Sequence, residues 1–351
     1  MKTDYLALKA AGHSLFRMTN QGLDCSLVRA SMERIVSNSD WFPVWTAVGA
    51  DFEELGDAAA VQGNLVSAGQ LLTKAALAYH FAQYLHFEDL DEKKRAAAAK
   101  VACYTRALPL QPVPGMRLEI PYSGRTIPAV LRLPPRGAGV PLALLVCGSD
   151  SSKEEHFAIE REFLARGMAT LSFDGPGQGE VSDWMPMRPS YHEAVSAVID
   201  YVQAEEGIDP HRIGVVGFGF GGMLAVSSAA ADQRIRACIS VSGYFDMCVM
   251  NWDDPIRSWR FAHIVGVETI AAAREVARGF TLEDWCDRLE CPVLVMHGQA
   301  DAGIPATAAK KIADRIGTNA EYYAVEAGVH CFHNVAFRTT PLICDWLAAH
   351  V

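Results

Sequence analysis

The fold is decided by residues 213–223, which read Ile-Gly-Val-Val-Gly-Phe-Gly-Phe-Gly-Gly-Met. The apolar run 213–216 is typical of a buried strand, and the glycine-rich turn that follows it leads into an apolar helix from Met223. The same alternation of a short apolar run and an amphipathic helix recurs along the chain. Further strands are expected at 142–147, 170–173, 237–241, 293–297 and 321–325. This alternation predicts an α/β fold, with a mostly parallel sheet and helices on both of its faces.

The first third of the chain has a different character. Residues 23–108 carry almost no strand signal, and stretches such as 65–87 and 93–108 have apolar residues at helical spacing. The prolines at 109, 112 and 114 end this pattern. We therefore predict a helical N-terminal cap over 1–113 and a catalytic domain over 114–351.

Two further elements are expected in the second domain. Residues 116–122 and 126–133 alternate apolar and polar side chains around Ser123-Gly124, which predicts a β-hairpin. Residues 245–289 interrupt the strand–helix alternation with three tryptophans and an acidic pair, Asp253-Asp254. We expect this segment to form a lid insertion over the carboxyl ends of the strands.

Composition excludes several classes of function. The 351 residues include 31 basic and 41 acidic side chains, and the net charge of −10 argues against a nucleic-acid partner. The longest apolar run, 140–146, is too short for a membrane span, and residues 1–5 lack the apolar core of a signal peptide. The nine cysteines form no CxxC pair, and the histidines no HExxH motif. We therefore expect a cytoplasmic protein without disulfides, metal or cofactor, whose partner is a small-molecule substrate.

The ends of the later strands carry candidate catalytic residues. Small residues around a strand-to-helix turn are typical of a nucleophile elbow, here 217–222. Asp301 follows the strand 293–297, and His330 follows the strand 321–325. Nucleophile, acid and base in this order indicate an α/β hydrolase, although the G-x-S-x-G motif would place serine where this chain has Gly219.

Each of these features has a competing interpretation. The glycine-rich turn has a second reading as a dinucleotide fingerprint, but its spacing is G-x-G-x-G-G and no acidic residue ends the next strand. Asp301 has a second reading as the cap of a helix that begins near Pro305, and His330 as an ordinary core or surface histidine.

Three motifs together sharpen the assignment. They are 147–155 (CGSDSSKEE), 174–180 (DGPGQGE) and 328–334 (GVHCFHN), and 78–82 (AYHFA) lies in the helical region. In this order they resemble the motifs of the α/β-hydrolase subfamily of 2,6-dihydroxypseudooxynicotine hydrolase. Fungal polyketide chain-shortening hydrolases are similar. The resemblance implies hydrolysis of a carbon–carbon bond next to a ketone, of retro-Claisen type, at a site between the sheet and the helical cap. It also suggests a homodimer.

The resemblance implies a role for particular residues. His330 would be the base and Asp301 would orient it. The backbone N–H of Phe220 and one in the Gly148–Ser149 turn would form the oxyanion hole. Asp246, Tyr79 and His80 are possible auxiliary residues, and the aromatic side chains of the cap imply an aromatic or polyketide-like substrate.

Gly219 leaves the reaction open. The glycine is either a natural departure from the family or an engineered change, and in both cases no acyl-enzyme can form at this position. Asp301 and His330 can activate water directly, or abstract a substrate proton as in a lyase or cyclase. Further hypotheses are a carboxylesterase, a nucleophile relocated to Ser149, Ser151 or Ser152, and a non-enzymatic binding protein.

Overall fold

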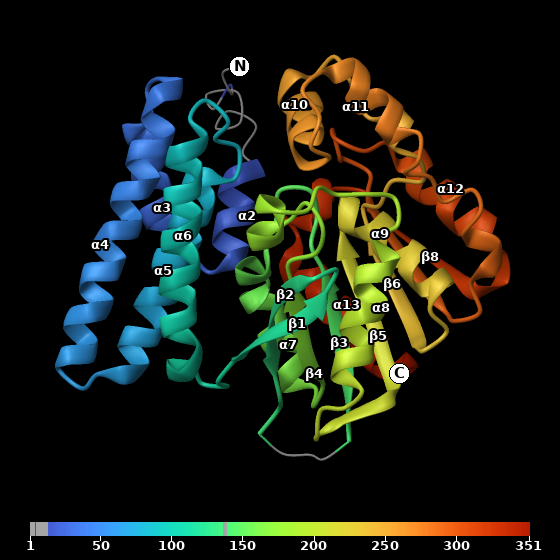
Figure 1. Cartoon of the computed structure of the whole chain (residues 1–351), viewed down its shortest axis with the longest axis horizontal. Helices are drawn as coiled ribbons and strands as arrows, with labels where there is room; N and C mark the ends of the chain where they lie inside the picture. Colours follow the sequence, from blue (N-terminus) through green and yellow to red (C-terminus); the bar gives the residue numbers. More distant parts are fainter. Residues whose placement is uncertain (1–3, 5–12, 136–138) are drawn as a thin grey trace. The chain divides into compact units, whose positions relative to one another are not determined.

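The computed structural model describes residue 4, residues 13–135 and residues 139–351, and the chain divides into two compact units (Figure 1). The first unit comprises Met1–Arg117 and Glu154–Ala158, and the second comprises Leu118–Lys153 and Ile159–Val351. Apart from Asp4, the N-terminal stretch 1–5, whose sequence lacks the core of a signal peptide, lies outside the described residues.

The first unit is helical, as the sequence predicts. Its long helices are α4 (Trp41–Val61), α5 (Leu65–Gln83) and α6 (Leu90–Ala107), and its shorter elements are α2 (His13–Gln21), α3 (Cys25–Arg34), η1 (Asn38–Asp40) and η2 (Leu108–Leu110). Helix α6 begins where the Asp89 side chain accepts hydrogen bonds from the N–H groups of Asp91 and Glu92, both at 2.9 Å. The residues from Ala75 to Gln83 of α5 are all buried, which explains why its Ala- and Leu-rich sequence lacks a polar face.

The second unit is built on one eight-stranded sheet in the order β1-β2-β4-β3-β5-β6-β7-β8. The strands are β1 (Met116–Tyr122), β2 (Arg125–Arg132), β3 (Val140–Val146), β4 (Ala169–Phe173), β5 (Ile208–Phe218), β6 (Ile235–Val241), β7 (Val293–Gly298) and β8 (Ala320–Val325). β2 pairs antiparallel with β4, and the neighbours from β4 to β8 are parallel. Ser123 and Gly124 join β1 to β2 with φ of 50° and 79°, as a two-residue hairpin turn requires. The mostly parallel sheet and the hairpin are therefore confirmed.

Helices cover both faces of this sheet. α8 (His192–Val202), α9 (Phe220–Ala231) and α12 (Ala306–Ile316) share one apolar core with Leu144 and Val215. α7 (Phe157–Ala165) and α13 (Ala336–His350) share the other with Leu145 and Val216. Because successive strand residues point to opposite faces, the continuous apolar runs of β3 and β5 are buried from both sides.

The segment 245–289 adds η5 (Met247–Val249), α10 (Pro255–Ile264), α11 (Ile270–Ala277) and η6 (Cys286–Arg288). Arg257 Nη1 donates to the Gly303 carbonyl at 2.8 Å, and Arg260 Nη1 lies 2.8 Å from Asp150 Oδ2. Gly303 follows β7 and Asp150 follows β3, so α10 is attached to two loops at the carboxyl ends of the strands. Among the described residues, every helix falls short of the length and apolarity that crossing a bilayer needs.

Candidate active site

The turn between β5 and α9 has the geometry of a nucleophile elbow. Gly219 lies between the two elements with φ of 58° and ψ of −122°. A Cβ at Gly217 would collide with the carbonyl oxygen of Gly221, and a Cβ at Gly221 would lie 2.5 Å from the carbonyl oxygen of Val146. Both flanking positions therefore require glycine, because the turn passes so close to neighbouring backbone.

The predicted acid and base form a hydrogen-bonded pair. Asp301 follows β7, His330 opens η8 (His330–Phe332) after β8, and His330 Nδ1 lies 2.7 Å from Asp301 Oδ2. The other carboxylate oxygen accepts from the N–H groups of Gly303 at 2.7 Å and Ile304 at 3.0 Å. The alternative in which Asp301 caps the next helix is wrong, since the residue before α12 is Pro305 and Asp301 bonds to its own loop.

Electrostatics fix the protonation of this pair. Burial alone would raise the pKa of Asp301, but the hydrogen bonds from His330 and two backbone N–H groups lower it below its ordinary value. An ionised carboxylate only accepts, so His330 Nδ1 carries the proton and Nε2 is directed elsewhere. Burial lowers the pKa of His330, but the adjacent Cys331 sulfur and the Asp301 carboxylate outweigh this effect and raise it to about 10.

The histidine and the elbow meet at one point. A Cβ built on Gly219 would lie 3.0 Å from His330 Nε2. A side chain at position 219 would thus contact Nε2 of the imidazole. The Asp301 side chain is fully enclosed while that of His330 is 29% exposed, so the imidazole is accessible and the carboxylate is not.

The predicted oxyanion donors lie at the neighbouring turns. Phe220 is the first residue of α9, so its N–H falls outside the helical hydrogen-bond ladder. Gly148 follows β3, and a Cβ there would lie 3.1 Å from the carbonyl oxygen of Phe218 beside the elbow. Gln178 Nε2 donates to the carbonyls of Cys147 at 2.7 Å and Gly148 at 3.1 Å, which fixes this turn. Ser149, next along the turn, is partly exposed.

The three possible auxiliary residues have other partners. Asp246 accepts from the N–H of Cys248 at 2.7 Å and so caps η5. In the helical unit, the Tyr79 hydroxyl donates to Glu53 at 3.0 Å, and burial raises the pKa of Tyr79. His80 Nε2 lies 3.5 Å from Glu155 Oε2, and burial lowers the pKa of this imidazole to about 4. These contacts indicate structural roles.

The aromatic side chains of the helical unit pack mainly against one another. Trp41, Trp45 and Phe81 are fully buried, and Trp41 Nε1 donates to the Phe81 carbonyl at 2.8 Å. The Trp41 and Trp45 ring centroids lie 6.1 Å apart. These three rings belong to the core of the unit, so they carry no information about a substrate.

Sequence reasoning missed Cys331. Its Sγ lies 3.8 Å from the position that a Gly219 Cβ would occupy, and its N–H donates to Ser242 Oγ at 3.1 Å. The only signal in the sequence is that this cysteine directly follows the predicted base.

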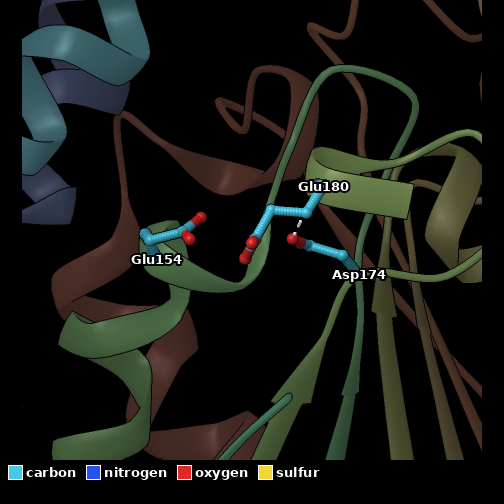
Figure 2. A group of neighbouring side chains, drawn as sticks. All are labelled: Glu154, Asp174 and Glu180. Atoms are coloured by element: carbon cyan, nitrogen blue, oxygen red, sulfur yellow. Dashed lines mark hydrogen bonds between the residues drawn. The ribbon is translucent and has the colours of Figure 1, made fainter. Parts of the chain in front are cut away.

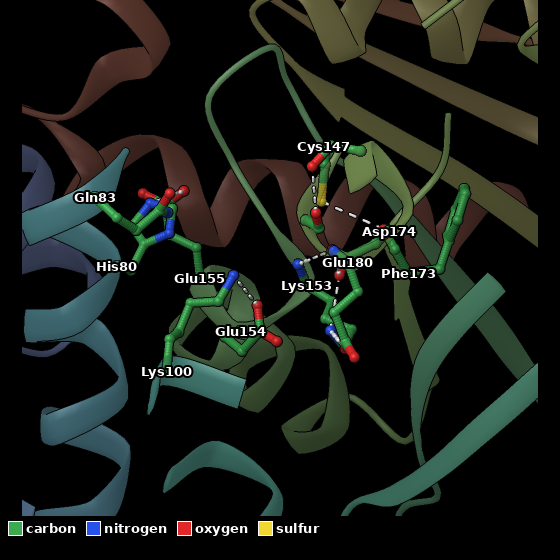
Figure 3. Close-up of polar contacts among 12 residues, drawn as sticks. His80, Gln83, Lys100, Cys147, Lys153, Glu154, Glu155, Phe173, Asp174 and Glu180 are labelled. Atoms are coloured by element: carbon green, nitrogen blue, oxygen red, sulfur yellow. Dashed lines mark hydrogen bonds and ion pairs between the residues drawn. The ribbon is translucent and has the colours of Figure 1, made fainter. Parts of the chain in front are cut away.

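Two carboxylates near β4 are spaced like cation ligands. Glu180 N–H donates to Asp174 Oδ2 at 3.1 Å, and both side chains lie together after the strand (Figure 2). Lys153 Nζ lies 2.7 Å from Asp174 and 2.6 Å from Glu180 (Figure 3), so a lysine ammonium already holds the place of a cation. This cluster fixes two loops and offers no open metal site.

A parallel sheet with a glycine-flanked turn after β5, an acid after β7 and a histidine after β8 defines the class of α/β hydrolases. Within it, the chain belongs to the FrsA-like esterase family, whose model matches residues 34–254, and the model of the dienelactone hydrolase family matches residues 184–338. The predicted relationship is confirmed at this level.

Individual relatives support the assignment. The chain is 33% identical to 2,6-dihydropseudooxynicotine hydrolase of Paenarthrobacter nicotinovorans, over 88% of this chain and 83% of the relative. It is 28% identical to hydrolase acrC of Aspergillus aculeatus, over 74% of each. The crystal structure of the 2,6-dihydroxy-pseudo-oxynicotine hydrolase superposes with a TM-score of 0.88 at 30% identity, covering 95% of each chain. AbyA5 shares the fold, with a TM-score of 0.77 at 19% identity and 99% of each chain covered.

Proposed function

We propose that this protein hydrolyses a carbon–carbon bond next to a ketone, by a retro-Claisen type reaction, in an aromatic or polyketide-like substrate. The proposal rests on one observation: the hydrogen-bonded imidazole of His330 is directed at the elbow. Its Nε2 lies 3.0 Å from the point that a Cβ on residue 219 would occupy. The relatives named above support the substrate class, because one is a hydrolase of 2,6-dihydropseudooxynicotine and another is a fungal hydrolase.

In this proposal Asp301 and His330 form a catalytic dyad. Asp301 keeps the proton on Nδ1, so Nε2 is the basic nitrogen. Nε2 removes a proton from the attacking group, which adds to the ketone carbon, and the backbone N–H groups of Phe220 and of the Gly148–Ser149 turn stabilise the resulting oxyanion. The bond to the adjacent carbon then breaks, and that carbon takes the proton back from His330. Since Gly219 has no hydroxyl, the attacking group must be water or another side chain.

Two further reactions use the same residues. The family name favours ester cleavage, in which an alcohol leaves in place of a carbanion. The absence of a hydroxyl at Gly219 favours a lyase or cyclase, in which His330 abstracts a substrate proton and no water is added. These are the second and third candidates.

Product analysis in ¹⁸O-labelled water distinguishes them. The unchanged protein and His330→Ala are assayed with acyl-phenols, β-diketones and activated esters. For the proposed function, one ¹⁸O appears in the carboxylic acid product of a β-diketone or acyl-phenol, and His330→Ala lowers the rate by about 10²–10⁴-fold. Turnover without ¹⁸O indicates a lyase or cyclase, and turnover of esters alone an esterase. If His330→Ala changes nothing, the site is not catalytic and the chain is a binding protein.

Restoring the hydroxyl tests the meaning of the glycine. If Gly219→Ser raises hydrolysis by several orders of magnitude, the glycine is a disabling change in a serine hydrolase. If the serine variant does not exceed the glycine form, the dyad works with another attacking group.

A further inference from the structure

Cys331 borders the same space as the catalytic histidine. The point at which a Gly219 Cβ would lie is 3.0 Å from His330 Nε2 and 3.8 Å from Cys331 Sγ. Cys331 as a residue is partly exposed. The Cys331 sulfur and the His330 imidazole therefore both lie next to the point where the elbow of other hydrolases carries its serine side chain.

The backbone holds Cys331 in an unusual conformation. Its φ of 53° and ψ of 20° are left-handed, and Phe332 follows with φ of 60°. Such conformations are costly for residues other than glycine and persist only where the surroundings impose them. Here the Cys331 N–H donates to Ser242 Oγ at 3.1 Å, and the Phe332 N–H donates to the Val329 carbonyl at 2.9 Å. The first bond ties the turn to the residue that follows β6, and the second closes the turn itself.

The imidazole next to this thiol is a strong base. The electrostatic effect of the adjacent Cys331 sulfur, together with the Asp301 carboxylate, raises the pKa of His330 despite its burial. The thiolate is the nucleophilic form of a cysteine, and a histidine beside the thiol is a base that takes up its proton. Asp301, His330 and Cys331 thus have the acid, base and nucleophile of a cysteine hydrolase.

We propose that Cys331 Sγ is the nucleophile of this site and carries the acyl group that Gly219 cannot accept. This inference rests on the hydrolase function proposed above and names its attacking group. The chemical class it implies is acyl transfer through a thioester.

The steps balance with water as the only co-substrate. The thiolate adds to the ketone carbon, and the carbonyl electron pair moves to the oxygen. Collapse breaks the bond to the adjacent carbon, whose electron pair takes the proton of His330 Nε2, and a thioester on Cys331 remains. His330 then takes a proton from water, the hydroxide oxygen adds to the thioester, and the carbon–sulfur bond breaks to release the carboxylic acid and the thiolate.

Cys248 provides a matched control within the chain. It is also solvent-exposed, but its neighbour is the Asp246 carboxylate, and burial and this carboxylate raise the pKa of its thiol. The Arg278 guanidinium acts in the opposite direction, but burial and Asp246 outweigh it, so the surroundings of Cys248 disfavour its thiolate.

The test is acyl trapping on the full chain with p-nitrophenyl acetate, followed by an acid quench and peptide mass mapping. We expect one acetyl group on the peptide that contains Cys331, removable by neutral hydroxylamine, and slower acetylation in His330→Gln. Turnover in Cys331→Ala should fall on the order of 10³-fold, while Cys248→Ala keeps the unchanged rate. Iodoacetamide should alkylate Cys331 at least about tenfold faster than Cys248 in the unchanged protein, a comparison that needs no variant to fold.

The outcomes separate the two proposals. If Cys331→Ala and Cys331→Ser keep full turnover while His330→Ala loses it, Cys331 is not the nucleophile and the dyad acts on water. Equal alkylation rates for Cys331 and Cys248, or acetylation elsewhere in the chain, would also overturn the thioester route. If turnover is the same in His330→Ala as in the unchanged protein, the proposed hydrolase function itself fails.

Discussion

At the scale of single residues, Gly219 combines a strained backbone conformation with a close contact. Its φ of 58° and ψ of −122° are rarely adopted by residues with a side chain, and a Cβ would lie 3.0 Å from His330 Nε2. We expect Gly219→Ala to lower the free energy of unfolding by about 1–3 kcal/mol, as measured by urea denaturation. Gly317 is the matched control, because it has φ of 75° and ψ of −127° with open space around its Cβ position. Equal losses in both variants would mean that the imidazole contact costs nothing.

His330 should make stability depend on pH in the alkaline range. Because its pKa is raised to about 10 in the folded protein, its contribution to stability is fully present below the unfolded value of about 6.5. The contribution is then lost as the pH rises toward 10. We expect the difference in unfolding free energy between the unchanged protein and His330→Gln to shrink by at least about 1 kcal/mol between pH 6 and pH 10. Urea denaturation at several pH values measures it, and parallel stability curves would contradict the prediction.

Part of this site could be predicted because its residues follow strand ends. Parallel strands bring their carboxyl ends to one edge, so the order of Gly219, Asp301 and His330 along the chain was enough to predict that they meet. The thiol of Cys331 could not be placed in this way. Its direction depends on left-handed backbone at two successive residues, and nothing in the residue types of Cys331 and Phe332 requires that conformation.

At the scale of elements, helix α10 positions loops that carry the predicted site. Arg260 pairs with Asp150 beyond the Gly148–Ser149 turn, and Arg257 binds the Gly303 carbonyl in the Asp301 loop. We expect Arg260→Met to lower turnover roughly tenfold to hundredfold, because small displacements of catalytic groups are costly. The thermal midpoint should change little, since the pair is partly exposed. Steady-state kinetics with Arg278→Met as the control test this, because Arg278 is 71% exposed on a neighbouring segment. Equal rates in both variants would show that α10 does not position the site.

The strands could be predicted well because a sheet buried on both faces demands continuous apolar runs. The exceptions are polar strand residues that find a buried partner on a covering helix, here Glu160 of α7. Arg132 at the end of β2 is fully buried against Glu160, which also accepts a hydrogen bond from Ser172 at 2.7 Å. A charge in a strand resembles an exposed residue in sequence, and only the fold reveals the carboxylate that neutralises it.

At the scale of the whole molecule, the helical unit is completed by a segment from the middle of the chain. Residues 154–158 belong to it. The buried Glu154 carboxylate lies 3.0 Å from Lys100 Nζ (Figure 3), and that of Glu155 lies 2.6 Å from Arg17 Nε. The sequence could not predict this, because the run 153–155 has the composition of a solvated loop. The two carboxylates are nevertheless 1% exposed.

This arrangement predicts that residues 1–117 will not fold stably alone. The isolated fragment keeps Arg17 and Lys100, and Lys100 is 1% exposed in the protein. The fragment lacks the carboxylates of Glu154 and Glu155 that pair with them. Removing one partner of a buried ion pair costs about 3–5 kcal/mol, because the remaining buried charge loses its counter-charge. We therefore expect little helical circular dichroism from the fragment, and a gain in helicity and in melting temperature when Arg17→Met and Lys100→Met are introduced together. If the unmodified fragment melts as high as the double variant, the segment 154–158 is not needed for the stability of the helical unit.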